Sequence, residues 1–261
     1  MRVRPAAIIA AMDDSRSTGA GTRTDGSPQA GPVATRDDGP GATHETGPGA
    51  THDVWHEAGI TVVPANRVAW EDLELVLGIA RCHGGRCYCQ RFKAPTPEWR
   101  TVDDAERAHR LRAQTECGQP GAPATSGLVA LVDGEPVGWC AVEPRTAYPK
   151  LLSTRIPWTG RQENRDDPSV WAVTCFVVRA SARRTGVTHV LARAAADHAR
   201  RRGAHAVEGY PMDTRPGADV PWGELHVGTR NAFAAAGFRE VSRPTKRRLV
   251  MRLDFGDGRG A

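Results

Sequence analysis

The residues best suited to chemistry stand where a strongly apolar run gives way to a helical pattern, in the segment RRTGVT at 183–188. Free backbone N–H groups at a helix start attract anions, and the helix dipole adds to this attraction. Arg183 and Arg184 can donate charge-assisted hydrogen bonds to phosphate oxygens, and Gly186 lets the backbone come close because it has no Cβ. The segment therefore predicts a phosphate-binding site.

The spacing of this segment separates it from two common nucleotide-binding motifs. The chain contains neither the GxxxxGK[ST] pattern of P-loop proteins nor the GxGxxG pattern of dinucleotide-binding folds. The predicted anion site depends instead on its position between a strand and a helix.

The charge distribution agrees with an anionic ligand. Residues 1–58 carry 5 basic and 8 acidic residues, whereas residues 59–261 carry 30 basic and 22 acidic residues, a net charge of +8. Only 3 of the 35 basic residues are Lys, which indicates a compositional bias towards Arg. The basic clusters come without a helix-turn-helix, zinc-finger or RNP-like pattern, so we expect no nucleic-acid partner.

A cysteine-rich segment, Cys82-His83 followed by Cys87-Tyr88-Cys89, is the second candidate for chemistry. Four such side chains could bind zinc, but no second CxxC or HxxxH module completes the pattern. Cys87 and Cys89 would also point to opposite faces of an extended segment. We expect thiols that pack or line a pocket and no metal site; structural zinc and a redox switch are the alternatives.

The elements that must position the anion site are a strand and the helix after it. Val170–Val178 is an almost wholly apolar run rich in β-branched residues, typical of a central strand covered on both faces. The helix after Gly186 ends near Gly203, and it places these residues on one face: Val187, Leu191, Ala194, Ala195 and His198.

Further elements flank this unit. Asp133-Gly134 predicts a hairpin within 127–144, and a long loop spans Pro144–Ser169. We also predict helices over 70–80, 102–117 (N-capped by Thr101) and 229–236. Strands are predicted near 206–210, 240–241 and 248–255, and a short strand followed by a turn within 60–70. This order predicts a mixed α+β fold.

Residues 1–58 differ in composition from the rest. They contain 8 Gly, 5 Pro and an eight-residue repeat at Gly31, Gly39 and Gly47, with no Leu or Phe. Such a segment buries too little apolar surface to offset the entropy of ordering it. We therefore predict a disordered low-complexity tail at 1–58 and one domain at 59–261.

The segment from Arg183 resembles the acyl-CoA-binding motif (Q/R)xxGx(G/A) of the GNAT superfamily of N-acyltransferases. Arg183 stands first and Gly186 fourth, while Thr188 replaces the usual Gly or Ala at the sixth place. The hairpin ending GWCAV and the later AFAAAGF also occur in the family's order. The resemblance covers about 128–255 and implies a mostly antiparallel mixed sheet flanked by helices.

The resemblance implies how acetyl-CoA would bind. The strand before the motif would splay from its neighbour and pair with the pantetheine arm, and the helix start would hold the pyrophosphate. These contacts would come from Phe176, Val177, Val178, Arg183, Arg184, Thr185, Gly186, Val187 and Thr188. An amine would attack the thioester directly.

This chemistry needs a base for the amine and a proton for the leaving thiolate. Many relatives use a Tyr in the last helix as the acid, but this chain has Phe233 there. Candidate catalytic residues are Glu143, Glu208 and Tyr210. Glu208 lies in an otherwise apolar strand, where it either points to solvent or lines the cleft with a raised pKa.

We thus expect a cytoplasmic acyl-CoA-dependent N-acetyltransferase with no membrane span or secretory signal. The alternative is a GNAT-fold module that binds CoA but catalyses little turnover and acts as a binding or regulatory module. The acceptor amine and the oligomeric state stay open, and a homodimer is compatible with the sequence.

Overall fold

The computed structural model describes residues 53–82, 85–214 and 222–256. The tail predicted to be disordered lies outside these residues up to residue 52, and so does His83. One boundary needs correction: Trp55–Glu57, assigned above to the tail, forms a strand, because it pairs with Ile60–Val62 in an antiparallel hairpin. The ordered domain therefore begins before residue 59.

Eight strands form one mixed sheet in the order β1-β2-β5-β6-β7-β8-β10-β9. Every neighbouring pair is antiparallel except β7 and β8, which are parallel. The strands are β1 Trp55–Glu57, β2 Ile60–Pro64, β5 Gly127–Val132, β6 Glu135–Pro144, β7 Val170–Val178, β8 Ala206–Gly209, β9 Arg239–Ser242 and β10 Val250–Asp254. A separate small hairpin pairs β3 Arg81–Cys82 with β4 Gly85–Arg86. The predicted α+β fold class is confirmed.

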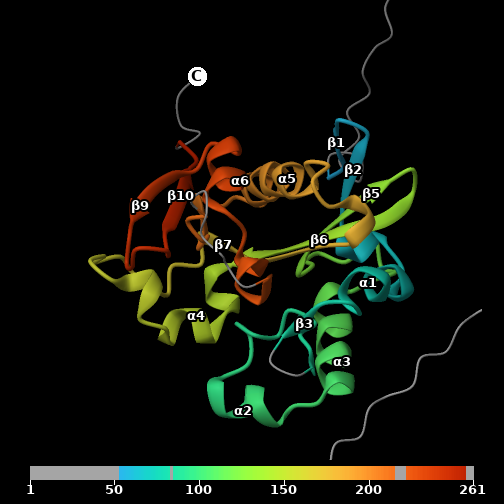
Figure 1. The fold of residues 1–261 in the computed structure, drawn as a ribbon, viewed down its shortest axis with the longest axis horizontal. Helices are drawn as coiled ribbons and strands as arrows, with labels where there is room; N and C mark the ends of the chain where they lie inside the picture. Colours follow the sequence, from blue (N-terminus) through green and yellow to red (C-terminus); the bar gives the residue numbers. More distant parts are fainter. Residues whose placement is uncertain (1–52, 83–84, 215–221, 257–261) are drawn as a thin grey trace, which may run out of the picture. The chain divides into compact units, whose positions relative to one another are not determined.

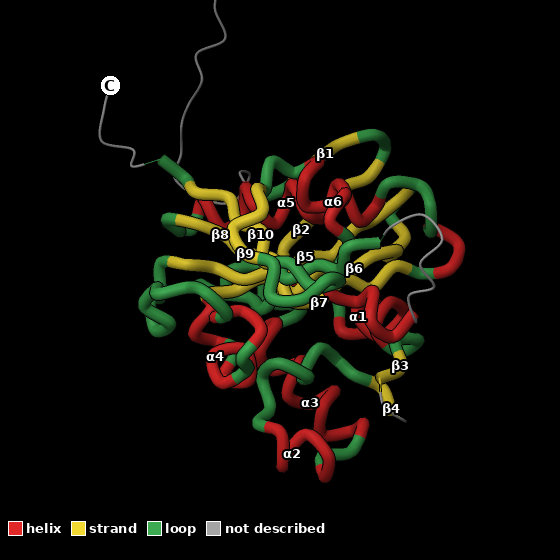
Figure 2. Tube along the Cα trace, turned by 60° about the vertical axis from the view of Figure 1, so that its left-hand side comes forward, coloured by secondary structure: helices red, strands yellow, loops and turns green. Residues whose placement is uncertain are grey.

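Helices cover both faces of the sheet. They are α1 Trp70–Leu77, α2 Thr96–Thr101, α3 Asp104–Thr115, α4 Pro149–Ser153, α5 Val187–Arg201 and α6 Arg230–Ala235. Figure 2 shows α5 and α6 on one face and α1, α3 and α4 on the other. Figure 1 shows α5 lying across the middle of the sheet.

The core follows these layers. The face under α5 is an apolar cluster that joins Val187, Leu191 and Ala195 to strand residues such as Val173 and Phe176. The opposite face packs α1 and α3 against β5, β6 and β7 through a second cluster. The predicted buried face of α5 is confirmed, since all five of its predicted residues are buried.

The local sequence explains the central elements. Asp133 and Gly134 both adopt positive φ, +50° and +82°, as a tight two-residue hairpin turn requires, and they join β5 to β6. Gly203 has φ +79° just after α5, the left-handed conformation that ends many helices. The strand predicted at 170–178 has the bounds of β7.

The helical region before β5 differs from expectation in two details. The second predicted helix begins at Asp104 and is capped by Asp103, whose carboxylate accepts from the Glu106 N–H at 2.8 Å, rather than by Thr101. Thr101 instead ends α2, a helix that was not predicted from the sequence; Pro97 occupies its first turn, where no N–H is needed. Within the described residues, no helix is both long and apolar enough to cross a membrane.

Candidate active site

Strands β7 and β8 separate partway along their length. They pair from Val170 opposite Ala206 to Val173 opposite Gly209; β8 then ends, whereas β7 continues to Val178. Among the described residues, no strand pairs with this edge of β7 beyond Val173. The edge therefore presents backbone donors and acceptors to whatever occupies the gap.

A β-bulge stands where the strands part. Ala141 of β6 is opposite Cys175, but the next residue, Val142, is opposite Val173, so Thr174 is the extra residue. Val173 packs in the cluster under α5, whereas Cys175 packs in the cluster on the α1 face. Strand residues two apart normally share a face, so the bulge reverses the alternation at the start of the free edge.

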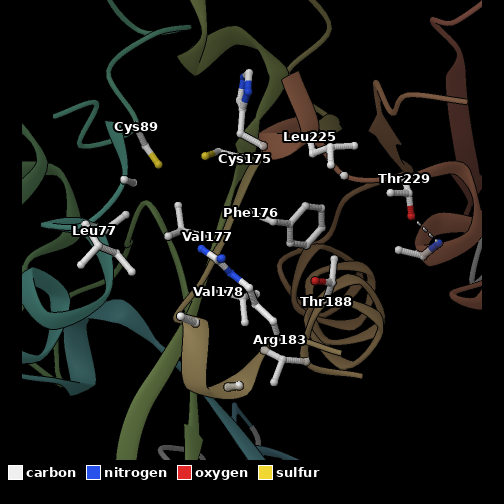
Figure 3. Close-up of a pocket in the computed structure, with 18 of the residues that line it drawn as sticks. Leu77, Cys89, Cys175, Phe176, Val177, Val178, Arg183, Thr188, Leu225 and Thr229 are labelled. Carbon is white, nitrogen blue, oxygen red and sulfur yellow. Dashed lines mark hydrogen bonds between the residues drawn. The ribbon is translucent and has the colours of Figure 1, made fainter. Parts of the chain in front are cut away.

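A cavity of about 900 Å³ opens along this free edge. Its wall is formed by the end of α1, the Cys87–Cys89 segment, Cys175–Val178 of β7, the start of α5, the Gly223–Thr229 segment and Ala232 of α6. Figure 3 shows Arg183 and Thr188 on one side of Phe176, and Cys89, Cys175 and Leu225 on the other. The cavity therefore joins the arginine-bearing turn to the cysteine-rich segment.

Eight of the nine residues predicted to contact the cofactor line this one cavity: Phe176, Val177, Val178, Arg183, Arg184, Gly186, Val187 and Thr188. The exception is Thr185. Its hydroxyl donates to the Ala182 carbonyl at 2.7 Å, which holds the turn together, and it is absent from the cavity wall.

The start of α5 has the geometry of an anion site. Gly186 is its N-cap with φ +89°, a left-handed conformation that favours glycine, and a Cβ there would meet no atom of the described chain within 4 Å. No described side chain caps the helix; the first N–H groups to bond back are those of His189 and Val190, to the Gly186 carbonyl. The N–H groups before them have no helical partner, and Arg183 and Arg184 are exposed beside them.

Glu208 does not belong to this cavity. Its side chain is fully buried in β8 and accepts hydrogen bonds from Arg145 at 3.2 Å, from Arg252 at 2.9 Å and from Arg161. Burial alone would raise the pKa of Glu208, but the hydrogen bond and charge of Arg161, the charge of Arg145 and the hydrogen bond of Arg252 outweigh it and lower the pKa. Both alternatives given for Glu208 are therefore wrong, because its side chain neither points to solvent nor lines the cavity with a raised pKa.

The arginines around Glu208 come from the predicted loop between β6 and β7 and from β10. Arg145 and Arg161 also stack near Trp158, with guanidinium carbons 4.8 and 5.8 Å from the ring centre. None of the residues of this loop, Pro144–Ser169, lines the cavity. The loop instead closes over the paired half of β7 and β8.

The two other predicted catalytic residues also lie off the cavity wall. Tyr210 is buried and donates to Glu208 at 3.0 Å; burial, then the charge of Glu208, raises its pKa well above the ordinary value. Glu143 forms an ion pair with Lys93 at 2.6 Å, and Lys93 also donates to the Ser126 hydroxyl at 2.9 Å. The structure places all three predicted acid–base residues in ion pairs or buried contacts.

Phe233, at the position where many relatives have Tyr, is a core residue. It is fully buried and packs edge-to-face on Phe176 and Phe238, with ring centres 5.7 and 5.0 Å apart. A Cβ on Gly209 would lie 2.2 Å from its ring and one on Gly228 2.9 Å. The ring thus occupies the space that these two glycines leave open.

The cysteine-rich segment contributes Cys87 and Cys89 to the cavity, and Figure 3 shows Cys89 opposite Cys175. The indole N–H of buried Trp139 donates to the Cys89 sulfur at 2.9 Å. This matches the expectation of thiols that line a pocket. The side chain of Cys82 lies outside the described part, as does His83; among the described residues no group of three or more His, Cys, Asp or Glu side chains could hold a metal.

Sequence reasoning missed His226, which lines the cavity from the short 3₁₀ helix at Trp222–Val227. Its Nδ1 lies 2.7 Å from the Gly223 carbonyl oxygen. A carbonyl only accepts hydrogen bonds, so Nδ1 carries the proton and Nε2 is the basic nitrogen of the neutral ring. No sequence pattern marks this residue, because its place on the wall depends on the gap between β7 and β8.

Comparisons with known proteins agree with this architecture. Residues 90–216 match the model of the acetyltransferase (GNAT) family, a range that includes β7, the anion site and β8. A search of curated proteins finds no match.

Solved structures with similar folds share little sequence with the chain. A GCN5-related N-acetyltransferase from Kribbella flavida is 19% identical, with 76% of this chain and 98% of that one covered and a TM-score of 0.42. The GNAT domain of S. lividans PAT is 17% identical, covering 75% and 90% with a TM-score of 0.42. The acetyltransferase yncA of Salmonella typhimurium, solved with acetyl-CoA, is 14% identical, covering 77% and 97% with a TM-score of 0.44.

Proposed function

Residues 90–216 match the model of the acetyltransferase (GNAT) family, and we propose that this chain transfers an acetyl group from acetyl-CoA to an amine. One observation carries the proposal. A single cavity runs from the open start of α5 along the unpaired edge of β7, and it joins an anion site to a strand edge.

The two parts of the cavity suit the two parts of the donor. The pyrophosphate would lie at the N–H groups of the α5 start, beside Arg183 and Arg184, which are exposed and positively charged. The pantetheine arm contains amides, and these would pair with the free edge of β7 as an added strand does. The thioester would then lie near the bulge at Thr174, where Cys175 meets the cavity.

The reaction needs no covalent enzyme intermediate. The amine nitrogen forms a bond to the thioester carbon, the carbon–sulfur bond breaks, and CoA leaves as the thiolate. The amine gives up a proton on the way, and the thiolate takes one from another group or from solvent. Phe233 has no proton to supply and is buried in the core.

His226 is the base that we propose for the amine. It lines the cavity, and the contact between its Nδ1 and the Gly223 carbonyl leaves Nε2 as the proton-accepting nitrogen. Glu208, in contrast, is fully buried and ion-paired to three arginines, so its negative charge balances theirs inside the protein.

The competing function is a module that binds CoA with little turnover, which the Phe at position 233 favours. Calorimetric titration with acetyl-CoA, followed by measurement of CoA release with a panel of amines, separates the two. Saturable binding with amine-dependent release supports the enzyme; binding without release for any amine supports the module. No binding to the folded chain would refute both.

A double variant tests where the donor binds. Replacing Arg183 and Arg184 by Ala removes two charge-assisted contacts, so acetyl-CoA affinity should fall on the order of 10- to 100-fold, with the larger loss at low salt. The control is Arg200→Ala, which removes an exposed arginine from the other end of α5 and should leave affinity unchanged. Unchanged affinity in the double variant would place the pyrophosphate elsewhere.

A further inference from the structure

The cavity has a second end whose chemistry differs from that of the anion site. In Figure 3 Cys89, Cys175 and Leu225 lie on the side of Phe176 that faces away from Arg183 and Thr188. Three further apolar residues line the cavity at and just after the end of α1, where the Cys87 N–H donates to the Ala80 carbonyl at 3.2 Å: Leu77, Ile79 and Ala80. We call this group of six residues the apolar end of the cavity.

Ile79 marks where the apolar end meets solvent. Three large apolar side chains are exposed among the described residues: Leu75, Ile79 and Val241, at 47%, 53% and 45%. Of these, Ile79 lines the cavity. A half-exposed apolar side chain at a cavity entrance gains most when a ligand with its own apolar surface covers it.

The make-up of the cavity wall favours the same kind of ligand. Its described residues include no Asp or Glu that could pair with an ammonium group. A ligand with a second ammonium group would bring that charge against apolar side chains and thiols, where loss of hydration is costly.

We propose, on the basis of the acetyltransferase function above, that the acceptor is a monoamine carried on an aliphatic or aromatic body. The amine lies near Cys175 and His226, and the body lies along Leu77, Ile79 and Leu225. Ile79 is then a specificity-determining residue. The other occupant of an apolar end would be a long acyl chain of the donor, but such a chain starts deep at the thioester, whereas half-exposed Ile79 lies where a ligand enters from solvent.

The test uses the full chain and two amines matched in length, hexylamine and 1,6-diaminohexane, which differ by one positive charge. Wild-type protein should have a kcat/KM at least tenfold higher for hexylamine. Ile79→Glu places a carboxylate at the entrance and should narrow or reverse this ratio by tenfold or more. Leu75→Glu makes the same change at an equally exposed residue of α1 that does not line the cavity, and it should leave the ratio unchanged.

Two further measurements separate this inference from the proposed function. The acetyl-CoA Kd, measured by calorimetry, should be the same for all three proteins; absence of binding in the wild type refutes the function itself. With acetyl-CoA bound, a preference for the diamine, no turnover of either amine, or equal effects of the two substitutions would overturn the inference. Faster turnover with octanoyl-CoA than with acetyl-CoA, lost in Ile79→Glu, would assign the apolar end to the donor and also overturn it.

Discussion

The two halves of β7 place arginines in opposite situations. In the half that pairs with β8, Arg145 and Arg161 are at most 5% exposed and bind the buried carboxylate of Glu208. In the half beyond Val173, Arg183 and Arg184 are exposed on a turn that opens into a cavity. Arg145 and Arg161 are therefore buried in ion pairs within the fold, whereas Arg183 and Arg184 face solvent.

The difference teaches that pairing decides what a charged residue can do. Where two strands stay together, the backbone is satisfied and a charge must find its partner inside the protein. Where they part, the edge of β7 faces the cavity. We therefore infer that Glu208, on the paired half, stabilises the fold, and that the proposed transfer takes place at the separated half.

The largest effect is expected for substitution of His226, which lines the cavity beside the separated half of β7. His226→Gln keeps an N–H donor for the Gly223 carbonyl but has no basic nitrogen, so kcat should fall about 10²- to 10⁴-fold, the usual contribution of a general base. The acetyl-CoA Kd should not change. The measurement is steady-state turnover with calorimetric titration of the same protein.

A second variant separates proton transfer from positioning. His226→Ala leaves space on the cavity wall, and added imidazole should restore part of its turnover while leaving the glutamine variant unaffected. Failure of imidazole to rescue, or a loss of acetyl-CoA affinity in both variants, would make His226 a structural residue of the wall.

The next largest effect is on stability, on the paired half. Glu208→Gln leaves three arginines around a buried neutral amide, so the free energy of unfolding should fall by about 3–5 kcal/mol. Glu163→Gln is the matched control: Glu163 pairs with the same arginines but is 38% exposed, and its loss should cost below about 1 kcal/mol. Denaturant unfolding measures both.

The difference in unfolding stability between wild type and Glu208→Gln should depend on pH. Because the pKa of Glu208 is lowered in the folded protein, its stabilising contribution is complete above the ordinary Glu value and is lost as pH falls through the folded-state value. The gap between wild type and Glu208→Gln should therefore narrow at acidic pH. A Glu208→Gln protein of wild-type stability that fails to turn over would return Glu208 to the catalytic site.

Much of the fold could be predicted because its signals are local. The strand at 170–178, the Asp133-Gly134 turn and the buried face of α5 each depend on a short run of residues and agree with the structure. The strand, turn and helix start of the proposed anion site could be predicted for the same reason, since they are contiguous in the sequence.

The rest depends on residues that are far apart in the sequence. Glu208 was expected to have a raised pKa because its strand neighbours are apolar, but the arginines that lower it stand at 145, 161 and 252. The bulge at Thr174 turns Cys175 to the face opposite Val173, and no side-chain pattern marks it. His226 reaches the cavity only because β8 ends early.

The smallest expected effect is that of a substitution at Phe233, whose ring fills the space beside Gly209 at the end of β8, where β7 and β8 part. Phe233→Tyr restores the side chain that many relatives use as an acid. Its Cζ lies 2.3 Å from where a Cβ of Gly209 would stand, so the new hydroxyl would meet the backbone of β8 in a fully buried site. The free energy of unfolding should therefore fall by about 1–3 kcal/mol, and turnover should not rise.

The control for Phe233→Tyr is Phe255→Tyr, a half-buried residue after β10, which should stay within about 0.5 kcal/mol of the wild type. Unfolding curves and the rate of CoA release together decide the outcome. A rise in turnover would mean that the hydroxyl reaches the leaving thiolate, and the ring would then belong to the cavity. With stability reduced and turnover flat, Phe233 is part of the core that ends the pairing of β7 and β8, and the proton for the thiolate comes from elsewhere.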